Sequence, residues 1–328
     1  MHFSYFCIME EQKNNITFIV NPISGTKSKD ALDTLVGEKI DATKYACEII
    51  KTDYAGHACE IAGRCRAAGI DICVAVGGDG TVNEVARALV GSATALGIIP
   101  CGSGNGLARH LRLPMDFGHA LEVINKGETA LFDYGVINDQ PFFCTCGMGF
   151  DAFVSLKFAQ AGKRGLATYI KTVLKEGLAY KPDVYTIVDD DHQHTYTAFL
   201  VACANASQYG NNAYIAPQAS MQDGLLDIII MEPFNLLEAA TLGIDLFAKT
   251  LKNNSHILTF QSRHIHIHRS QSGAVHFDGD PTTMGTDLDV SISPLGLKAV
   301  INPDYVEDRA VPGRAMDMLS KTIDHIII

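Results

Sequence analysis

The stretch Ile72-Cys73-Val74-Ala75-Val76-Gly77-Gly78-Asp79-Gly80-Thr81-Val82-Asn83-Glu84 predicts the fold of the first part of the chain. The apolar run at its start is rich in β-branched residues, which indicates a buried strand, and the apolar spacing after Thr81 indicates one face of a helix. Strand, glycine turn and helix therefore follow one another. Three glycines in four positions let the backbone approach a bulky ligand, and the helix start supplies unpaired N–H groups that favour phosphate.

Asp79 is the unexpected member of this glycine turn. A carboxylate beside a phosphate would repel it unless the carboxylate binds Mg²⁺ or takes a proton from a reacting hydroxyl. The alternative is a plain turn between a strand and a helix.

The composition limits the class of protein. A chain of 328 residues with 47% apolar content can bury a large core, and its length favours two domains. A net charge of −11 argues against a nucleic-acid partner. Nine cysteines without a CxxC pair indicate reduced thiols and a cytoplasmic protein. No transmembrane helix or signal peptide is expected, and the protein could equally start at Met9.

Three more polar loops follow predicted strands. Asn21 to Gly25 follows the strand 16–20, Thr52 follows the strand 46–51 and precedes a helix over 57–68, and Gly102 to Gly106 follows the strand 95–100. The last loop lacks the Lys of a Walker A motif and the third small residue of a dinucleotide fingerprint. Alternating strands and helices predict a parallel sheet that binds its ligand at the carboxyl ends of the strands.

From about residue 132 the pattern changes to many short strands with few helices between them, which predicts a β-rich sandwich as the second domain. The predicted strands are 132–138, 142–146, 184–189, 194–205, 225–231, 257–269, 274–277, 288–292 and 297–301.

The glycine turn at 77–81 resembles the nucleotide motif of the diacylglycerol kinase catalytic-domain family, which includes bacterial diacylglycerol and lipid kinases and sphingosine kinases. The loops at 21–25, 52–58 and 102–106 resemble further motifs of that family. The resemblance implies an α/β nucleotide-binding domain and ATP, or another nucleoside triphosphate, as phosphoryl donor. The residues that would hold this nucleotide are Asn21, Ser24, Thr52, Gly77, Gly78, Gly80, Thr81, Ser103 and Asn105.

Asp278-Gly279-Asp280 ends a predicted strand with two carboxylates, which a strand would place on one face although the glycine leaves that geometry open. Phosphoryl transfer needs Mg²⁺ and a group that accepts the alcohol proton. The segment resembles the Asp-Gly-Glu motif of the family, which implies that Asp278 is the general base and that Asp280, in place of Glu, lies near the metal or phosphates. Together with Asp79 these are the expected catalytic residues. An acidic β-turn is the alternative.

Asp223 lies in a turn before an apolar strand. This turn resembles the loop that binds a structural Mg²⁺ in bacterial lipid kinases, which implies ligands from the Asp223 carboxylate and the carbonyls of Ser220 and Leu225. An Asp-Gly turn without a metal is the alternative.

His264, His266 and His268 alternate with isoleucines, which places three imidazoles on one face of a strand. Successive side chains on that face lie about 7 Å apart, too far for a single zinc ion, so solvent-facing histidines are favoured.

The segment 157–181 carries six basic residues and one acidic residue, with leucines and isoleucine at helical spacing. It predicts a basic amphipathic helix that suits an anionic membrane surface; a helix that packs on the sandwich is the alternative.

These observations together predict a kinase that uses ATP and Mg²⁺ to phosphorylate a primary hydroxyl of a diacylglycerol-like or sphingoid lipid. Gly106 stands where many bacterial relatives carry Asp, which leaves the lipid open. An NAD kinase and a non-catalytic lipid- or nucleotide-binding protein are the alternatives. The expected organisation is a nucleotide domain over 9–131, a substrate domain over 132–302 and a segment 303–328 that returns to the first. A cytoplasmic protein is expected, and both a homodimer and peripheral contact with the inner face of a membrane through 157–181 are left open.

Overall fold

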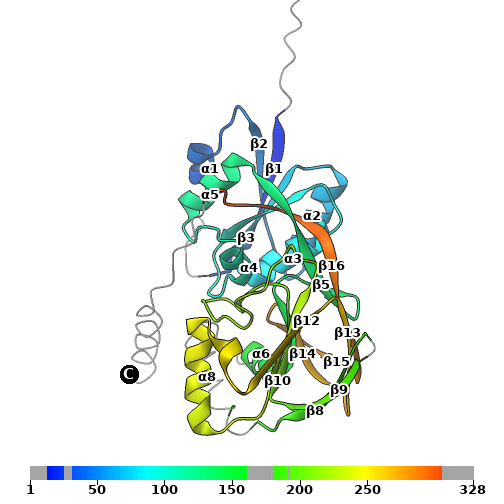
Figure 1. Ribbon diagram of the computed structural model, residues 1–328. Helices are drawn as coiled ribbons and strands as arrows, with labels where there is room; N and C mark the ends of the chain where they lie inside the picture. The colour runs from blue at the N-terminus through cyan, green and yellow to red at the C-terminus, as the bar shows by residue number, and fades with distance from the viewer. Residues whose placement is uncertain (1–12, 26–31, 161–176, 178–179, 191, 305–328) are drawn as a thin grey trace, which may run out of the picture.

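The computed structural model describes residues 13–25, 32–160, 177, 180–190 and 192–304. These residues form two lobes, an α/β lobe that contains β1 to α5 and a sandwich lobe that contains β5 to β16 (Figure 1). The α/β lobe consists of β1 (Asn14–Val20), α1 (Leu32–Lys39), β2 (Tyr45–Lys51), α2 (His57–Ala67), β3 (Ile72–Gly77), α3 (Asp79–Leu89), β4 (Ala95–Pro100), α4 (Gly106–His110) and α5 (Phe117–Lys126).

The sandwich lobe consists of β5 (Thr129–Ile137), β6 (Gln140–Phe142), β7 (Thr145–Gly149), α6 (Phe150–Gln160), β8 (Asp183–Asp189), β9 (His192–Ala198), β10 (Leu200–Ala204), β11 (Leu226–Met231), α8 (Leu236–Ala248), a 3₁₀ turn η1 (Leu251–Asn253), β12 (Ile257–Ser262), β13 (His264–Arg269), β14 (Gly273–Phe277), β15 (Asp280–Met284) and β16 (Asp287–Val300).

The α/β lobe contains the predicted parallel sheet, in the strand order β2-β1-β3-β4. Every residue of β3 and β4 is buried, as a strand covered on both faces requires. The helix α3 buries Val82, Val85, Ala86 and Leu89 on one face, at the spacing that the sequence predicts. All four strands therefore direct their carboxyl ends, and the loops that follow them, toward one edge of the sheet.

The strands β5 and β16 join the two lobes. Ala299 of β16 pairs in parallel with Leu96 of β4, and an earlier part of β16 pairs with β13 of the sandwich. Figure 1 shows β16, in orange, running from one lobe into the other. The ten-stranded sheet of the described chain is thus continuous across both lobes. Of the segment 303–328 only the start is described, where Lys126 of α5 bonds to Asp304.

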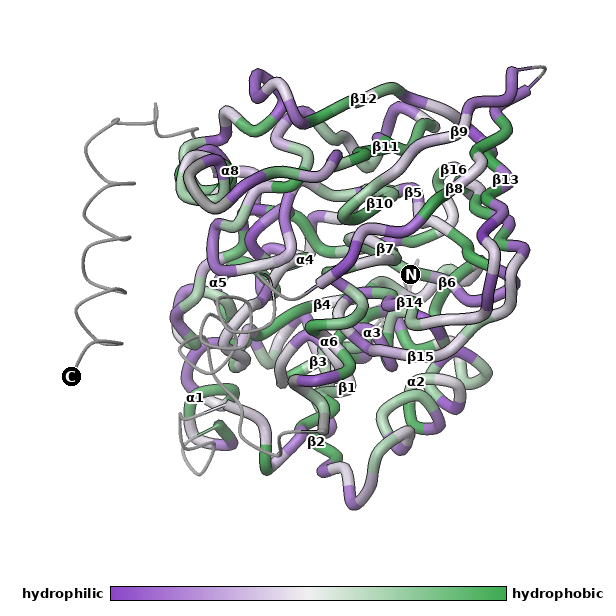
Figure 2. The backbone as a smooth tube through the Cα atoms, turned by 90° about the horizontal axis from the view of Figure 1, so that it is seen from below, coloured by the Kyte–Doolittle hydropathy of each residue, from purple (hydrophilic) through white to green (hydrophobic). Residues whose placement is uncertain are grey.

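The sandwich lobe packs the far part of the ten-stranded sheet against a six-stranded sheet of order β12-β11-β10-β7-β14-β15. Figure 2 shows hydrophobic segments along strands inside this lobe and hydrophilic segments in peripheral loops. The residues of its core, such as Tyr185, Ile228 and Ile267, come from both sheets. The predicted β-rich sandwich is confirmed.

Several predicted strand boundaries were wrong. The predicted strands 194–205 and 257–269 are each divided, at Phe199 and at Arg263, and their halves lie in different sheets. Conversely, the predicted strands 288–292 and 297–301 are one strand, β16, with an irregularity between Ser293 and Leu297. The sequence reading also missed the helix α8.

Candidate active site

The loops after β1 and β3 meet through two predicted nucleotide residues. The amide of Asn21 donates from Nδ2 to the Thr81 hydroxyl oxygen at 3.0 Å, and the Ser24 hydroxyl donates to the Asn21 carbonyl at 3.1 Å. Thr81 also occupies the space beside Gly77, where a Cβ would lie 2.5 Å from the Thr81 side chain. Gly77 is therefore required for the tight turn into α3.

The loops after β3 and β4 also touch, at Gly78 and Gly102. A Cβ on Gly102 would lie 2.7 Å from the Cα of Gly78, so the two backbones approach too closely for a side chain. The residues 102–106, which we call the nucleotide loop, therefore lie beside the start of α3. Asn105 adopts a left-handed conformation with φ 53°, and its side-chain oxygen and nitrogen bond to the backbone N–H and C=O of Gly102 at 2.9 and 2.8 Å.

The carboxylate of Asp79 holds this nucleotide loop. Its two oxygens accept the backbone N–H groups of Asn105 at 2.9 Å and Gly106 at 2.7 Å. Burial raises the pKa of Asp79, while these hydrogen bonds act in the opposite direction. Asp79 thus connects two loops of the cradle, a role that a plain turn would not need.

Asp278 lies across from α3, on the sandwich lobe, and is surrounded by donors. Its Oδ2 accepts the Asn83 amide at 2.7 Å and the Phe143 N–H at 2.9 Å. Its Oδ1 accepts the N–H groups of Cys144 at 2.7 Å and Thr145 at 3.1 Å. Burial raises the pKa of Asp278 and the four hydrogen bonds oppose the rise. A carboxylate has about four lone-pair positions, and here each is used.

Asp278 and Asp280 belong to one hairpin, formed by β14 and β15, which we call the carboxylate hairpin. Asp278 and Gly279 have φ of 51° and 88° and connect Phe277 to its partner Asp280. Positive φ at both central residues is the mark of the type I′ hairpin turn. Of the two geometries that the sequence left open, the structure therefore has the turn, and the two carboxylates do not lie along a single strand.

Asp280 is the carboxylate that remains open. Its side chain reaches solvent, and among the described residues it forms no hydrogen bond or ion pair. Desolvation by the surrounding protein is the main cause that raises the pKa of Asp280, and the negative charges of Asp278, Glu84 and Asp79 raise it further. Negative charges from both lobes therefore lie close enough to Asp280 to raise its pKa.

Asn83 and Glu84 were given no role from the sequence alone. Asn83 lies four residues after Asp79, on the same face of α3, and that spacing is the signal that could have identified it. Glu84 accepts the N–H groups of Gly56 at 2.9 Å and Ala58 at 3.2 Å, so it satisfies the start of α2. Both residues hold neighbouring elements against α3.

The remaining predicted nucleotide residues lie at the same edge of the sheet. Thr52 is buried directly after β2, where its N–H donates to the Val20 carbonyl at 2.9 Å. Ser103 is exposed in the nucleotide loop, and Gly80 is exposed in the first turn of α3. The structure thus brings the carboxyl ends of β1 to β4 together as predicted, while the roles in binding stay predictions.

The predicted metal residues lie apart from the carboxylate hairpin, against the strand β5. Asp223 Oδ1 accepts the Leu225 N–H at 3.0 Å, and the buried Asp133 accepts the Gly224 N–H at 2.8 Å. The hydroxyl of Ser220 accepts the Gln222 N–H at 3.3 Å. A hollow of about 490 Å³ adjoins this loop. Carboxylate and carbonyl oxygens are the hard donors that Mg²⁺ prefers, and binding of the ion by Asp223, Ser220 and Leu225 stays a prediction.

Within the described ranges no three His, Cys, Asp or Glu side chains are grouped closely enough to hold a metal ion. A Mg²⁺ ion that arrives with a nucleotide does not need such a group, since it is held by one or two carboxylates together with phosphate oxygens and water.

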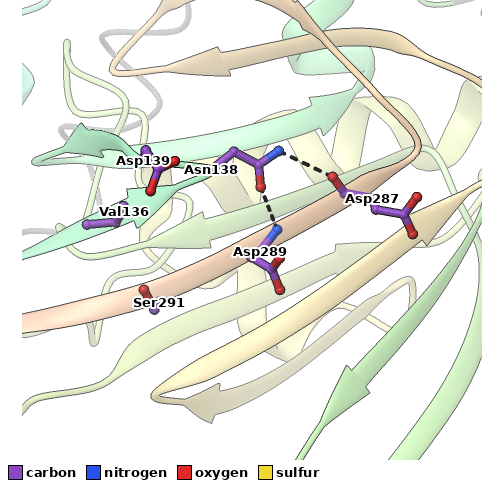
Figure 3. A pocket seen from close by; sticks show the side chains of 6 residues that line it. All are labelled: Val136, Asn138, Asp139, Asp287, Asp289 and Ser291. Atoms are coloured by element: carbon purple, nitrogen blue, oxygen red, sulfur yellow. Dashed lines mark hydrogen bonds between the residues drawn. The ribbon is translucent and has the colours of Figure 1, made fainter.

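The three histidines of β13 face solvent, as predicted, while Ile265 and Ile267 are buried. The carboxylate of Asp289 lies 3.0 Å from Nδ1 of His266, and that of Asp287 lies 2.8 Å from Nδ1 of His268. Figure 3 shows these two aspartates on β16, where the Asn138 side chain bonds to the backbone of both. The three residues line a hollow of about 390 Å³. This face lies on the outer side of the sandwich, away from its core.

The predicted amphipathic segment 157–181 lies mostly outside the described residues. In the part of the chain that is described, no helix has the length and apolar character needed to span a membrane.

Comparison with known proteins gives two family matches. Residues 15–137 match the model described as "Diacylglycerol kinase catalytic domain", and residues 144–301 match the "YegS C-terminal NAD kinase beta sandwich-like domain". The chain is 28% identical over 242 residues to the "Probable lipid kinase YegS-like" of Klebsiella pneumoniae (strain 342), which covers 72% of this chain and 79% of that one.

An uncharacterized protein of Synechocystis sp. is 30% identical over 282 residues; the match covers 80% of this chain and spans only 64% of the length of that relative. A crystal structure of a diacylglycerol kinase from Bacillus anthracis str. Sterne has the same fold, with a TM-score of 0.70 and 22% identity over 89% of this chain and 98% of that one.

Proposed function

Because the chain belongs to the diacylglycerol kinase catalytic-domain family, we propose that it is a lipid kinase that transfers the γ-phosphoryl group of ATP to a primary hydroxyl of a diacylglycerol-like or sphingoid lipid. The observation that carries this proposal is an open carboxylate, Asp280, on a hairpin that Asn83 of α3 holds through Asp278, beside the glycine-rich cradle at the carboxyl ends of four parallel strands. Phosphoryl transfer requires positioning of the nucleotide and one acceptor for the alcohol proton, and this arrangement can supply both.

In the proposed reaction the lipid hydroxyl oxygen attacks the γ-phosphorus and the bond to the oxygen between the β- and γ-phosphorus breaks. The alcohol proton passes to Asp280, and ADP and a lipid phosphomonoester leave. Bound Mg²⁺ would neutralise the phosphate charge. The backbone N–H groups of Gly78 and Gly80, the Thr81 hydroxyl and Ser103 would bind the phosphates.

We assign the proton to Asp280. The family resemblance instead implies that Asp278 is the base. All lone-pair positions of Asp278 are used by four donors, so this carboxylate would have to break a hydrogen bond before it could accept a proton. Asp280 has open oxygens, and its raised pKa makes it a stronger base than an ordinary Asp. Asp278 instead joins the lobes.

The test is an assay of purified protein with Mg²⁺ and radiolabelled ATP against a panel that contains diacylglycerol, a sphingoid base, ceramide and NAD, with products separated by thin-layer chromatography. We expect label in one lipid and none in NAD. Label in NAD alone would favour the NAD kinase alternative. The second matching family model is described as an NAD kinase-like sandwich, so this alternative is included in the panel. Nucleotide binding without any labelled product would favour a non-catalytic protein.

A further inference from the structure

A buried polar cluster lies under α6, and the proposed reaction does not use it. Nε2 of His276 lies 3.0 Å from Oδ2 of Asp151, and the hydroxyl of Tyr209 donates to the same oxygen at 3.1 Å. The other oxygen of Asp151 accepts the N–H of Ala152 at 2.7 Å. His276 and Asp151 are only 2% and 6% exposed. Buried polar groups are costly unless they are paired, so this cluster calls for a reason.

The contacts fix the form of the His276 ring. Asp151 is an acceptor here, so Nε2 carries the proton that it donates. Nδ1 is buried and has no hydrogen-bond partner among the described residues. A proton on Nδ1 would create a buried, unpaired N–H beside the first, and such a group costs about 1–3 kcal/mol. The tautomer with the proton on Nε2 is therefore favoured over the one with the proton on Nδ1.

The strand next to the cluster leaves room for it at Gly147, the pairing partner of His276. A Cβ on Gly147 would lie 2.2 Å from Oδ2 of Asp151 and 2.8 Å from Nε2 of His276. No other residue type fits at position 147 without moving both groups. The hydrogen bond between His276 and Asp151 is thus built into three separate elements, β7, α6 and β14.

This hydrogen bond holds the carboxylate hairpin between its open end and its turn, close to the turn. His276 precedes Asp278 by two residues and pairs with Pro281, the neighbour of Asp280. At the open end of the hairpin, the buried guanidinium of Arg269 donates to the carbonyls of Gly273, Ala274, Met284 and Gly285. The turn is held by Asp278. The hairpin that carries Asp280 is therefore held at three points: by Arg269 at the open end, by His276 near the turn and by Asp278 in the turn.

The other end of the cluster reaches the nucleotide loop through the segment that contains Tyr209. The N–H of Asn211 donates to the Gly104 carbonyl at 3.0 Å. A Cβ on Gly210 would lie 2.9 Å from the Cα of Gly104, and one on Gly106 would lie 3.2 Å from the Tyr209 carbonyl oxygen. One chain of contacts therefore runs from the nucleotide loop through Tyr209, Asp151 and His276 to the carboxylate hairpin.

We propose that His276, Asp151 and Tyr209 form a positioning unit that fixes Asp280 relative to the phosphates bound by the nucleotide loop. The proposal rests on the function proposed above, because it concerns the geometry of that same site. None of the three residues needs to touch the substrate. Loss of the unit should lower kcat, since a misplacement of about 1 Å can cost roughly 10²-fold, while the nucleotide contacts and the KM for ATP remain.

The experiment compares four variants by kcat and KM, each normalised to folded protein by circular dichroism and thermal melting. His276→Leu removes the donor to Asp151, His276→Gln keeps an N–H near the Nε2 position, and Tyr209→Phe removes a single hydroxyl. Tyr214→Phe is the matched control, since the Tyr214 hydroxyl bonds to Asn212 at 3.4 Å and, among the described residues, to no side chain of the unit.

We expect kcat to fall about 10- to 100-fold in His276→Leu and about 5-fold or more in Tyr209→Phe, with KM for ATP within twofold of the parent. His276→Gln should recover at least half of the logarithmic loss, and the Tyr214→Phe control should match the parent. If His276→Leu does not fold, Tyr209→Phe carries the test. A kcat per folded protein within threefold of the control in Tyr209→Phe, together with a lower melting temperature, would reduce the unit to a structural role and overturn the proposal.

A spectroscopic measurement separates this proposal from the proposed function. Nitrogen-15 spectra of histidine-labelled protein should show His276 protonated at Nε2, with the signal assigned through its absence in His276→Gln. Added ADP should shift that signal in the parent and much less in Tyr209→Phe. A protonated Nδ1, or no shift with ADP at saturation, contradicts the positioning unit whether or not a lipid is phosphorylated; the expected shifts with no labelled lipid would contradict only the lipid kinase function.

Discussion

The amide of Asn83 donates to Oδ2 of Asp278 at 2.7 Å and so joins two residues that stand 195 positions apart in the chain. Asn83 lies on α3, the helix that begins at Asp79, and Asp278 forms the turn of the carboxylate hairpin. This single contact connects the nucleotide cradle of one lobe to the hairpin of the other. The stability and the chemistry of the site are therefore linked through Asp278.

Asp278→Asn should destabilise the protein. An asparagine at this position offers one oxygen and places an NH₂ group against two N–H donors, so buried hydrogen bonds to a charged group are lost. We expect the free energy of unfolding to fall by about 2–4 kcal/mol, measured by urea denaturation with circular dichroism. Asp280→Asn, on the same hairpin, is the matched control and should be as stable as the parent or more stable, because it removes repulsion between carboxylates. Equal stability of Asp278→Asn and the parent would show that the four hydrogen bonds are not formed.

The Asp223 loop should bind Mg²⁺ without nucleotide. Millimolar Mg²⁺ should raise the melting temperature of the parent, since a ligand at about ten times its Kd stabilises by about 1.4 kcal/mol. Asp223→Asn keeps an oxygen for the Leu225 N–H and removes the charge. We expect this variant to melt like the parent in the absence of Mg²⁺ and to lose the increment. An increment of the same size in both proteins would place the ion elsewhere.

The histidine face of β13 should make stability depend on pH. The hydrogen bond to Asp289 is the main cause that raises the pKa of His266, and Asp287 contributes further. A raised pKa means that the folded state binds the proton more tightly, so this stabilisation is complete below the ordinary pKa of histidine and is lost as the pH rises through the raised value. The partner of His266 on β8 is the uncharged Val188.

The carboxylates that face these histidines act at the acidic end. The hydroxyl of Thr286 and the ring of His268 hold the pKa of Asp287 at about 2, and that of Asp289 is also lowered. Their contribution is present above the ordinary Asp pKa and is lost as the pH falls toward 2. His266→Gln should therefore lower the melting temperature at pH 5.5 more than at pH 8.5, and 0.5 M salt should reduce the difference. A loss that does not change with pH would contradict this account.

Activity should also depend on pH through Asp280. Its pKa is raised, so the carboxylate stays protonated to a higher pH than an ordinary Asp and cannot accept the alcohol proton there. We expect kcat/KM to rise with pH along an acidic limb whose midpoint lies above the ordinary Asp value. Asp280→Glu should retain a limb of this kind, whereas Asp280→Asn should lose it. A limb that persists in Asp280→Asn belongs to another group.

The fold was largely predictable because its signals are local. The residues 72–84 carry strand, turn and helix in consecutive positions, and the alternation of His264, Ile265 and His266 directly reports the inner and outer faces of a strand. The divisions at Phe199 and Arg263 were not predictable, because the apolar pattern continues while the chain passes from one sheet to the other.

The sequence identified motifs that the structure brings together at the candidate site, but it did not identify the hydrogen bonds between them. The glycine loops and the aspartates of the carboxylate hairpin stand out as motifs. Three of the four donors to Asp278 are the backbone N–H groups of Phe143, Cys144 and Thr145, which any residue but proline could supply and which no sequence pattern marks. The contact between His276 and Asp151 likewise depends on the empty space at Gly147.

The central claim is that Asp280 accepts the proton of a lipid alcohol, and turnover of Asp280→Asn tests it most directly. The measurement is kcat for the lipid that the panel assay identifies, at saturating ATP and Mg²⁺ and per mole of folded protein. The account predicts a loss of roughly 10² to 10⁴-fold with an unchanged or higher melting temperature, since general-base catalysis typically contributes that much. Turnover of Asp280→Asn within threefold of the parent would contradict it.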